Sequence, residues 1–272
     1  MLQTTATLIE RRVVGAHQEL HLQASALARS LTPGQAVLVK AGWGSEPYLR
    51  RTFYPVGLAD ESWILRVPPG SDWGHAWLRA AAVGAALDCL GPVGIGFSVP
   101  AGARNLLCLG EEDPASAGWS GASAWALLPA IAQAARSGLA VTFAMEAPTP
   151  RDLIPAHRLP AAVEYHTAIR PRRPAARPGG PASIEGVPQF LPELLPWADA
   201  VLAIGSRAFY GELAATARAA RYELVHGFAQ ILYPTAFLCG VGACQACVAD
   251  LTTGRRRICQ RGPVLDLLDV AG

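Results

Sequence analysis

The first hundred residues contain short apolar runs and alternations of polar with apolar side chains. Residues Glu19–Gln23 alternate in this way, and Ala36–Lys40 and Trp63–Val67 are short runs typical of strands. Pro-Gly pairs and glycine-rich segments separate them and are typical of tight turns. The pattern predicts a small antiparallel β-barrel as a first domain over residues 1–100.

After residue 100, apolar runs alternate with alanine-rich stretches of helical character. We expect buried strands over residues 105–109, 139–144 and 200–204, and helices over residues 123–136 and 209–220. Strands that alternate with helices indicate βαβ units and a parallel sheet. We therefore expect an α/β domain over residues 101–226 and a small third domain over residues 227–272.

One segment of the second domain departs from this pattern. Arg170–Pro181 combines four arginines with four prolines. Proline has no backbone N–H donor, so this segment cannot form a helix or a central strand. We expect a solvated loop, and docking of an acidic partner surface is the alternative for its arginines.

Composition restricts the classes of function. Of 272 residues, 51% are hydrophobic and 16% are charged, which excludes global disorder. The formal net charge of +2 disfavours a nucleic-acid partner, because polyanion binders concentrate positive charge. We find neither a secretory signal pattern nor about 20 uninterrupted apolar residues, so we expect a cytoplasmic protein without membrane spans.

Four cysteines near the C-terminus have the spacing of a metal centre. Cys239, Cys244, Cys247 and Cys259 follow C-x4-C-x2-C-x11-C, and small residues fill the first loop. The first three match plant-type [2Fe–2S] ligation, with a fourth thiolate from further along the chain. Structural zinc and a redox C-x-x-C pair are the alternatives, but zinc ribbons usually carry two C-x2-C pairs, and a redox pair leaves two cysteines without a role. Cys89 and Cys108 lie in apolar surroundings and are expected to be buried without a chemical role.

With these cysteines, the chain resembles the electron-transfer subunit of bacterial dihydroorotate dehydrogenase, a member of the ferredoxin-reductase superfamily. The resemblance rests on the cysteine loop with Cys259–Val264, and on elements in the family's order along the first domain. These elements are Pro33–Gln35, Leu49–Tyr54, Leu65–Val67, Gly74–Leu78 and Gly91–Phe97. The family implies an FAD-binding barrel and a role connected with pyrimidine biosynthesis.

The resemblance also implies which residues contact the flavin. Arg51 would bind the pyrophosphate, Phe53 would lie near the isoalloxazine ring, and Tyr54 would reach the flavin with its hydroxyl. The full expected set is Arg51, Thr52, Phe53, Tyr54, Leu65, Arg66, Val67, Gly74 and His75. Tyr54 stands where the family has Ser or Thr, and His75 stands where it has Thr.

The nicotinamide elements of the family are altered. A glycine-rich phosphate turn is expected after the first strand of the α/β domain, but Gly110 is followed by Glu111, Glu112 and Asp113. Gly118 and Gly121 are candidate remnants of that turn. The later C-G-P-x-x-M element reads Ile204–Phe209. We therefore expect an NAD(H) site that is degraded or rebuilt, with carboxylates facing any incoming phosphate.

Taken together, these observations predict an iron–sulfur flavoprotein that relays electrons between FAD and a [2Fe–2S] cluster, without an acid, base or nucleophile of its own. The family implies a heteromer with a flavin-bearing dehydrogenase subunit, and a ferredoxin-like protein is a second candidate for electron exchange. A scaffold with structural zinc and a reductase component for a different oxidation remain as alternatives.

Overall fold

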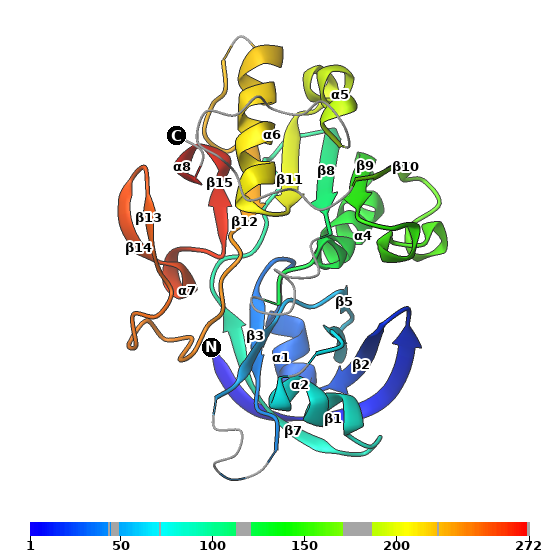
Figure 1. The fold of residues 1–272 in the computed structure, drawn as a ribbon, viewed down its shortest axis with the longest axis vertical. Helices are drawn as coiled ribbons and strands as arrows, with labels where there is room; N and C mark the ends of the chain where they lie inside the picture. Colours follow the sequence, from blue (N-terminus) through cyan, green and yellow to red (C-terminus); the bar gives the residue numbers. More distant parts are fainter. Residues whose placement is uncertain are drawn as a thin grey trace.

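The computed structural model describes residues 1–42, 44, 49–70, 72–112, 121–170, 187–221 and 223–270. Two sheets of different character lie one above the other, with a smaller lobe at one side (Figure 1). The Arg170–Pro181 loop lies outside the described residues except for Arg170. Within the described parts of the chain, no helix has the length and apolar character needed to cross a bilayer.

The N-terminal half forms a curled antiparallel sheet in the order β4-β3-β7-β1-β2-β6-β5. Its strands are β1 (Leu2–Val14), β2 (His17–Gln23), β3 (Ala36–Val39), β4 (Arg51–Phe53), β5 (Gly57–Leu58), β6 (Ser62–Val67) and β7 (Ala86–Val93). Helices α1 (Ser25–Ser30) and α2 (Trp73–Ala80) connect them. Along β6, Trp63, Leu65 and Val67 are buried and alternate with partly exposed residues, as the period of two in a strand requires.

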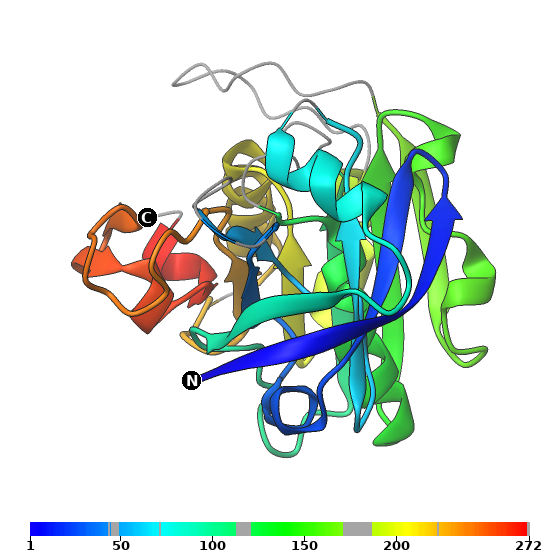
Figure 2. The ribbon, with the colours of Figure 1, turned by 90° about the horizontal axis from the view of Figure 1, so that it is seen from below.

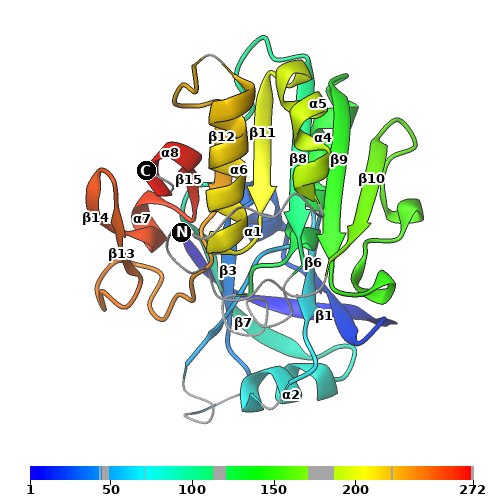
Figure 3. The ribbon, with the colours of Figure 1, turned by 45° about the horizontal axis from the view of Figure 1, so that its top comes forward.

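The second sheet has the order β10-β9-β8-β11-β12-β15, and all neighbouring pairs are parallel except β12 with β15. Its strands are β8 (Asn105–Glu111), β9 (Ala140–Ala147), β10 (Glu164–Ile169), β11 (Ala200–Ile204), β12 (Ala229–Leu232) and β15 (Val264–Asp266). The helices are α4 (Leu128–Arg136), α5 (Leu191–Trp197) and α6 (Arg207–Ala220), with single turns η1 (Ala124–Leu127), η2 (Pro150–Asp152), η3 (Ala156–Arg158) and η4 (Val187–Gln189). Helices α5 and α6 lie side by side on one face (Figure 3).

The cluster lobe is the segment between β12 and β15. It contains the cysteine loop, the hairpin of β13 (Val248–Leu251) and β14 (Gly254–Arg257), and helix α7 (Ile258–Arg261); α8 (Leu267–Val270) follows β15. This lobe extends from one side of the molecule (Figure 2). Because β12 and β15 belong to the six-stranded sheet, the expected division at residue 226 cuts across that sheet, and the extending part begins after β12.

The fold expected from the sequence is confirmed, because a curled antiparallel half-barrel is followed by a mostly parallel α/β sheet. One apolar core connects the regions. It runs from β8, β9 and β11 to Leu38 and Val93 of the half-barrel and to Cys247 and Cys259 of the cluster lobe. A second core fills the half-barrel. The lobes are therefore packed against each other by buried apolar side chains.

Candidate functional site

The cysteine loop is shaped by residues with left-handed backbone conformation. Gly240 and Gly242 have φ of +69° and +78°, and Gln245 has φ of +57°. A Cβ atom at Gly242 would lie 2.5 Å from the end of the Gln260 side chain of α7, so glycine suits this position by its conformation and allows the close approach of that side chain. The loop is thus folded back tightly on the helix that carries Cys259.

The four cysteines form two pairs. Cys239 lies against Cys244, whose backbone N–H donates to the Cys239 Sγ atom at 3.5 Å. Cys247 and Cys259 are both buried and interact through their thiols, and Cys239 is close enough to influence Cys259. In a four-cysteine [2Fe–2S] centre two irons share four thiolates, and two pairs of thiols at one end of the lobe fit this donor set. Among the described residues no three His, Cys, Asp or Glu side chains converge on a single metal position.

The loop backbone favours ionised sulfur at one of these pairs. Burial raises the pKa of Cys239, but hydrogen bonds from the backbone N–H groups of Cys244, Val241 and Ala243 lower it overall, to about 6. Burial and the neighbouring Cys247 raise the pKa of Cys259 to about 12. Thiolate is the form that binds iron, and N–H groups directed at sulfur are a common way of tuning such a centre.

The cluster lobe is hydrogen-bonded to the expected flavin motif. The Phe237 N–H donates to the Thr52 hydroxyl at 2.8 Å, and that hydroxyl donates to the Phe237 carbonyl oxygen at 3.3 Å. The Tyr54 hydroxyl donates to the Thr235 carbonyl oxygen at 3.4 Å. Thr52 and Tyr54, both expected to serve the flavin, therefore hold the segment that leads into the cysteine loop.

The Arg51 guanidinium binds an anionic group of the protein itself, the carboxylate of Asp72. The guanidinium donates from Nε and Nη2 to the two carboxylate oxygens of Asp72, at 2.7 and 2.8 Å. Asp72 is also the N-cap of α2 and accepts the His75 N–H at 2.9 Å. Hydrogen bonds from Arg51 lower the pKa of Asp72 to about 2. Gly74 allows this approach, since a Cβ atom there would lie 2.8 Å from the Arg51 Nε atom.

Tyr54 and Arg66 meet at the junction of the two sheets. They line a cavity of about 10 Å³ together with His17, Val56, Pro68, Gly121 and Ser123. Burial raises the pKa of the Tyr54 hydroxyl. The Arg66 guanidinium covers the Trp125 ring at 4.1 Å, and its Nε atom is buried without a hydrogen-bond partner among the described residues. The cavity is thus small, and one of its lining residues has a buried donor without a partner among the described residues.

The remaining expected flavin residues are mostly core residues. Phe53, Leu65 and Val67 are buried in the half-barrel. The Phe53 ring meets the His75 imidazole edge-on at 5.7 Å. The nine expected residues therefore form two groups, one around Arg51 and one around Tyr54 and Arg66. The apolar side chains of Phe53, Leu65 and Val67 belong to the core of the half-barrel.

The carboxylates of Glu111, which ends β8, and Glu112, which follows it, were expected to face an incoming phosphate, but both are buried. The Glu111 carboxylate accepts the Ser206 N–H at 2.6 Å, at the N-terminus of α6. The Glu112 carboxylate accepts the Ala124 N–H at 3.0 Å, at the start of η1, and pairs with Arg66 at 3.1 Å. Buried helix starts need such partners, so both carboxylates have a structural use. Asp113 and Gly118 lie outside the described residues.

Gly121, the other candidate remnant of the phosphate turn, packs on the half-barrel. Its φ is +72°, and a Cβ atom there would lie 2.3 Å from the Thr52 carbonyl oxygen. The residue therefore joins the α/β domain to β4. It does not line an open turn.

Sequence reasoning did not identify Asp72, or the inward positions of Glu111 and Glu112, as parts of the site. For Asp72 a local signal exists, because an aspartate directly before a helix is a common N-cap. For Glu112 no local signal exists, since Arg66 lies in a different domain, 46 residues earlier.

The cluster lobe is similar to a known protein domain. A family model described as the iron–sulfur cluster binding domain of dihydroorotate dehydrogenase B matches residues 235–271. This C-terminal part of the chain is thus similar to the iron–sulfur domain of a dihydroorotate dehydrogenase electron-transfer subunit. The matched range contains all four cysteines and supports the expected iron–sulfur cluster, while their role as its ligands stays a prediction. A search of curated proteins found no match.

Solved structures support the fold of the whole chain. An NADH-dependent reduced ferredoxin–NADP oxidoreductase, studied for flavin-based electron bifurcation, has a TM-score of 0.73 at 17% identity, over 97% of this chain and 89% of that one. The ferredoxin reductase of carbazole 1,9a-dioxygenase has a TM-score of 0.58 at 20% identity, over 80% and 65% of the two chains. A cytochrome P450 reductase of Amycolatopsis has a TM-score of 0.58 at 16% identity, over 82% and 67%.

Proposed function

We propose that this chain is an electron-transfer iron–sulfur flavoprotein that relays electrons between FAD and a [2Fe–2S] cluster. The observation that carries the proposal is the paired-cysteine loop hydrogen-bonded through Phe237 to Thr52, in the middle of the expected flavin motif. When bound, FAD exchanges electrons in pairs or singly and the cluster exchanges them singly. The role of the chain is to hold the FAD site and the cluster site next to each other.

For FAD, the proposed pyrophosphate site is the N-terminus of α2 with Arg51. Asp72 takes there the contacts that a phosphate oxygen takes at a helix start. FAD binding accordingly requires that Asp72 release Arg51. The isoalloxazine ring would enter beside Tyr54 and Arg66, where the free Arg66 Nε atom suits a flavin carbonyl, and the small cavity requires side chains around it to move.

The proposed electron partners are proteins. The family of the cluster lobe implies a heteromer with a flavin-bearing, dihydroorotate dehydrogenase-like subunit, and a ferredoxin-like protein is a further candidate. A reductase component for a different oxidation fits the same sites. The iron–sulfur family model favours an electron-transfer role over a zinc scaffold.

Anaerobic purification with cofactor analysis tests the proposal. We expect about two irons, two sulfides and one FAD per chain, and a reductive titration that takes up about three electrons, two for the flavin and one for the cluster. Cys259→Ser should remove the cluster while keeping the flavin. Cys89→Ala, which changes a buried cysteine of the half-barrel, is the control and should keep both. Zinc without sulfide, or no bound flavin after FAD titration, would refute the proposal.

A further inference from the structure

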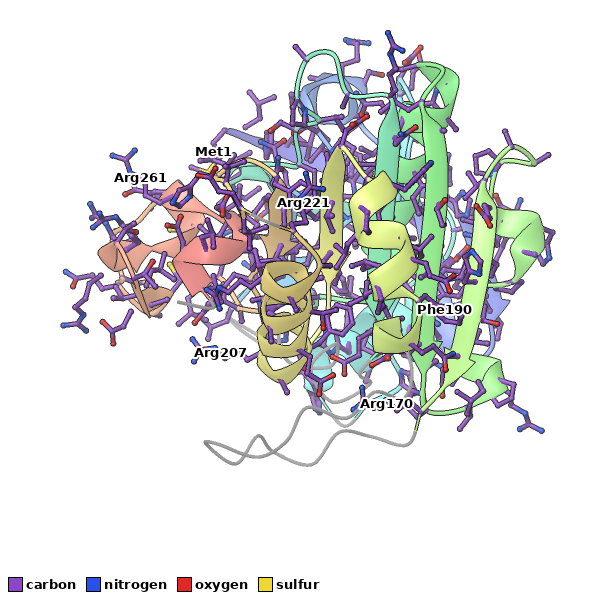
Figure 4. All side chains as sticks on the ribbon, turned by 90° about the horizontal axis from the view of Figure 1, so that it is seen from above. Met1, Arg170, Phe190, Arg207, Arg221 and Arg261 are labelled. Carbon is purple, nitrogen blue, oxygen red and sulfur yellow. The ribbon has the colours of Figure 1, made fainter. Side chains whose placement is uncertain are left out.

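The outer surface of the cluster lobe is rich in arginine. Arg255, Arg256 and Arg257 are consecutive in β14, Arg261 ends α7, and all four are exposed. These four arginines, here named the arginine face, line a hollow of about 470 Å³ with Gln245, Val248 and Gln260. Arg261 lies at the outer edge of the lobe (Figure 4).

The positive charge of the arginine face is largely uncompensated. Arg255 pairs with Asp250 at 3.2 Å, and both side chains are about four-fifths exposed, at 78% and 82%. Exposed pairs of this kind interact weakly. Within the described part of the chain, no carboxylate lies within 4 Å of the guanidinium groups of Arg256, Arg257 or Arg261. The face therefore presents a positive potential to solvent.

The arginine face borders the cysteine loop directly. Arg257 donates to the Gly242 carbonyl oxygen at 3.1 Å, and the Gln260 amide donates to the Val241 carbonyl oxygen at 3.3 Å. On the same loop Leu238 and Val241 are 43% and 44% exposed, and Cys244 is exposed. Apolar residues bordered by charged ones are typical of a protein-docking surface, and this one lies on the exposed side of the cluster site.

We propose that the arginine face docks an acidic one-electron carrier protein, which exchanges an electron with the cluster. This inference rests on the proposed function and adds the surface and the chemistry of its partner. One electron passes from the reduced carrier to the oxidised cluster, or in the opposite direction, and no bond breaks and no proton moves. Opposite charges accelerate such encounters by roughly 10- to 1000-fold at low salt, and salt screens the attraction.

Binding of a redox-inactive carrier tests the docking apart from electron transfer. The probe is an acidic plant-type ferredoxin with gallium in place of iron, titrated into the cluster-loaded protein. The test variant is Arg255→Glu/Arg256→Glu, which leaves the Arg257 contact with the loop intact. The matched control is Arg29→Glu/Arg136→Glu, because it changes the net charge equally at exposed positions on α1 and α4.

We expect the test variant to bind the probe at least about tenfold more weakly near 0.05 M salt, with the difference shrinking toward 1 M salt as the Debye length falls to about 3 Å. The control should stay within about twofold of the wild type. Equal losses in both variants, or no loss in either, overturn the proposal. So does a change confined to the midpoint potential of the cluster, or salt-dependent binding of a DNA duplex that the test variant alone loses.

The same samples separate this inference from the proposed function. Iron, sulfide and visible absorption are measured before each titration. A wild-type protein without a cluster refutes the proposed function, whereas an intact cluster with unchanged affinity for the probe refutes the docking surface alone.

Discussion

Asp72 is the residue whose chemistry bears most directly on flavin affinity. Its carboxylate is bound by Arg51 and by the start of α2, the two groups that we propose for the FAD pyrophosphate. A carboxylate and a phosphate cannot share these donors, and their charges repel each other. At the proposed site, FAD would therefore compete with the Asp72 carboxylate for these donors.

We predict that Asp72→Asn binds FAD more tightly than the wild type. Asparagine keeps the N-cap acceptor but removes the charge and the bidentate contact with Arg51. Loss of a charge-assisted competitor worth about 1.5 kcal/mol corresponds to roughly a tenfold gain in affinity. Fluorescence titration of the flavin-free protein measures this, with Asp60→Asn as a control for a change in net charge. Weaker FAD binding by Asp72→Asn would contradict the prediction.

His17 links folding stability to pH at the junction of the sheets. Burial, together with Arg66 and Arg79, lowers its pKa to about 4, although Asp152 opposes the shift. In the unfolded chain the value is near 6.5. Between pH 6.5 and 4 the unfolded state therefore binds more protons than the folded state, so stability falls as the pH falls through this window.

We predict that His17→Gln flattens this pH dependence. The wild type should lose on the order of 1 to 2 kcal/mol more than the variant between pH 7 and 5, after allowance for partial solvent access. Thermal unfolding midpoints at several pH values measure the difference. Exposed His157, changed to Gln, is the control and should retain the wild-type slope. Parallel curves for the wild type and His17→Gln would exclude His17 as the cause.

At the scale of elements, the segment from Gly121 to η1 fixes how the α/β domain meets β4. Gly121 has positive φ and contacts the Thr52 backbone, and three residues later Ala124 donates its N–H to Glu112. Thr52 in turn binds Phe237 before the cysteine loop. A change at Gly121 therefore acts on the junction of all three regions.

We predict that Gly121→Ala destabilises the protein more than Gly138→Ala. Both glycines have positive φ, +72° and +82°, but a Cβ atom meets nothing within 4 Å at Gly138 and lies 2.3 Å from the Thr52 oxygen at Gly121. Left-handed conformation costs both variants about 1 kcal/mol, and the clash should add about 1 to 3 kcal/mol for Gly121→Ala. Denaturant unfolding compares the free energies of unfolding of the two variants. Equal losses of stability would show that the backbone around Thr52 shifts at little cost, which would contradict the prediction.

Local sequence patterns predicted the helices and strands well. The features that these patterns did not predict depend on contacts between residues distant in the sequence. Strands such as β6 and β11 follow from alternation or from continuous apolar runs, and the C-x4-C-x2-C spacing of Cys239, Cys244 and Cys247 marked the cysteine loop because a known motif has that spacing. The Arg51–Asp72 pair spans 21 residues, and β12 and β15 pair across the whole cluster lobe. Such partners depend on the packing of domains, which residue spacing alone does not determine.

For the molecule as a whole, buried polar contacts connect regions that are distant in sequence. Arg66 of the half-barrel pairs with Glu112, and Arg158 pairs with Glu19 at 2.8 Å. Trp125 lies between them, with the Arg66 and Arg158 guanidinium groups 4.1 and 5.4 Å from its ring centre. Removing one partner of a buried pair is strongly destabilising, so these contacts favour a fixed arrangement of the two sheets.

This arrangement also determines how a dinucleotide would meet the α/β domain. In folds of this type phosphates bind at helix starts beyond the carboxyl ends of the parallel strands. Here Glu111 binds the start of α6, and Glu112 binds the start of η1, which leads into α4. Both carboxylates are buried, and burial raises the pKa of Glu112 against the opposing effect of Arg66.

We predict that neither NADH nor NADPH reduces this protein efficiently. Each carboxylate that a phosphate displaces costs about 1.5 to 3 kcal/mol, so losing both lowers affinity by two or more orders of magnitude. Stopped-flow mixing of the oxidised protein with each nucleotide under anaerobic conditions checks this, and reduction by photoreduced deazaflavin shows that the cofactors are competent. Rapid bleaching of the flavin band at micromolar nucleotide would mean that phosphate binds elsewhere in the domain. Slow bleaching would favour a protein as the electron donor that reduces the cluster.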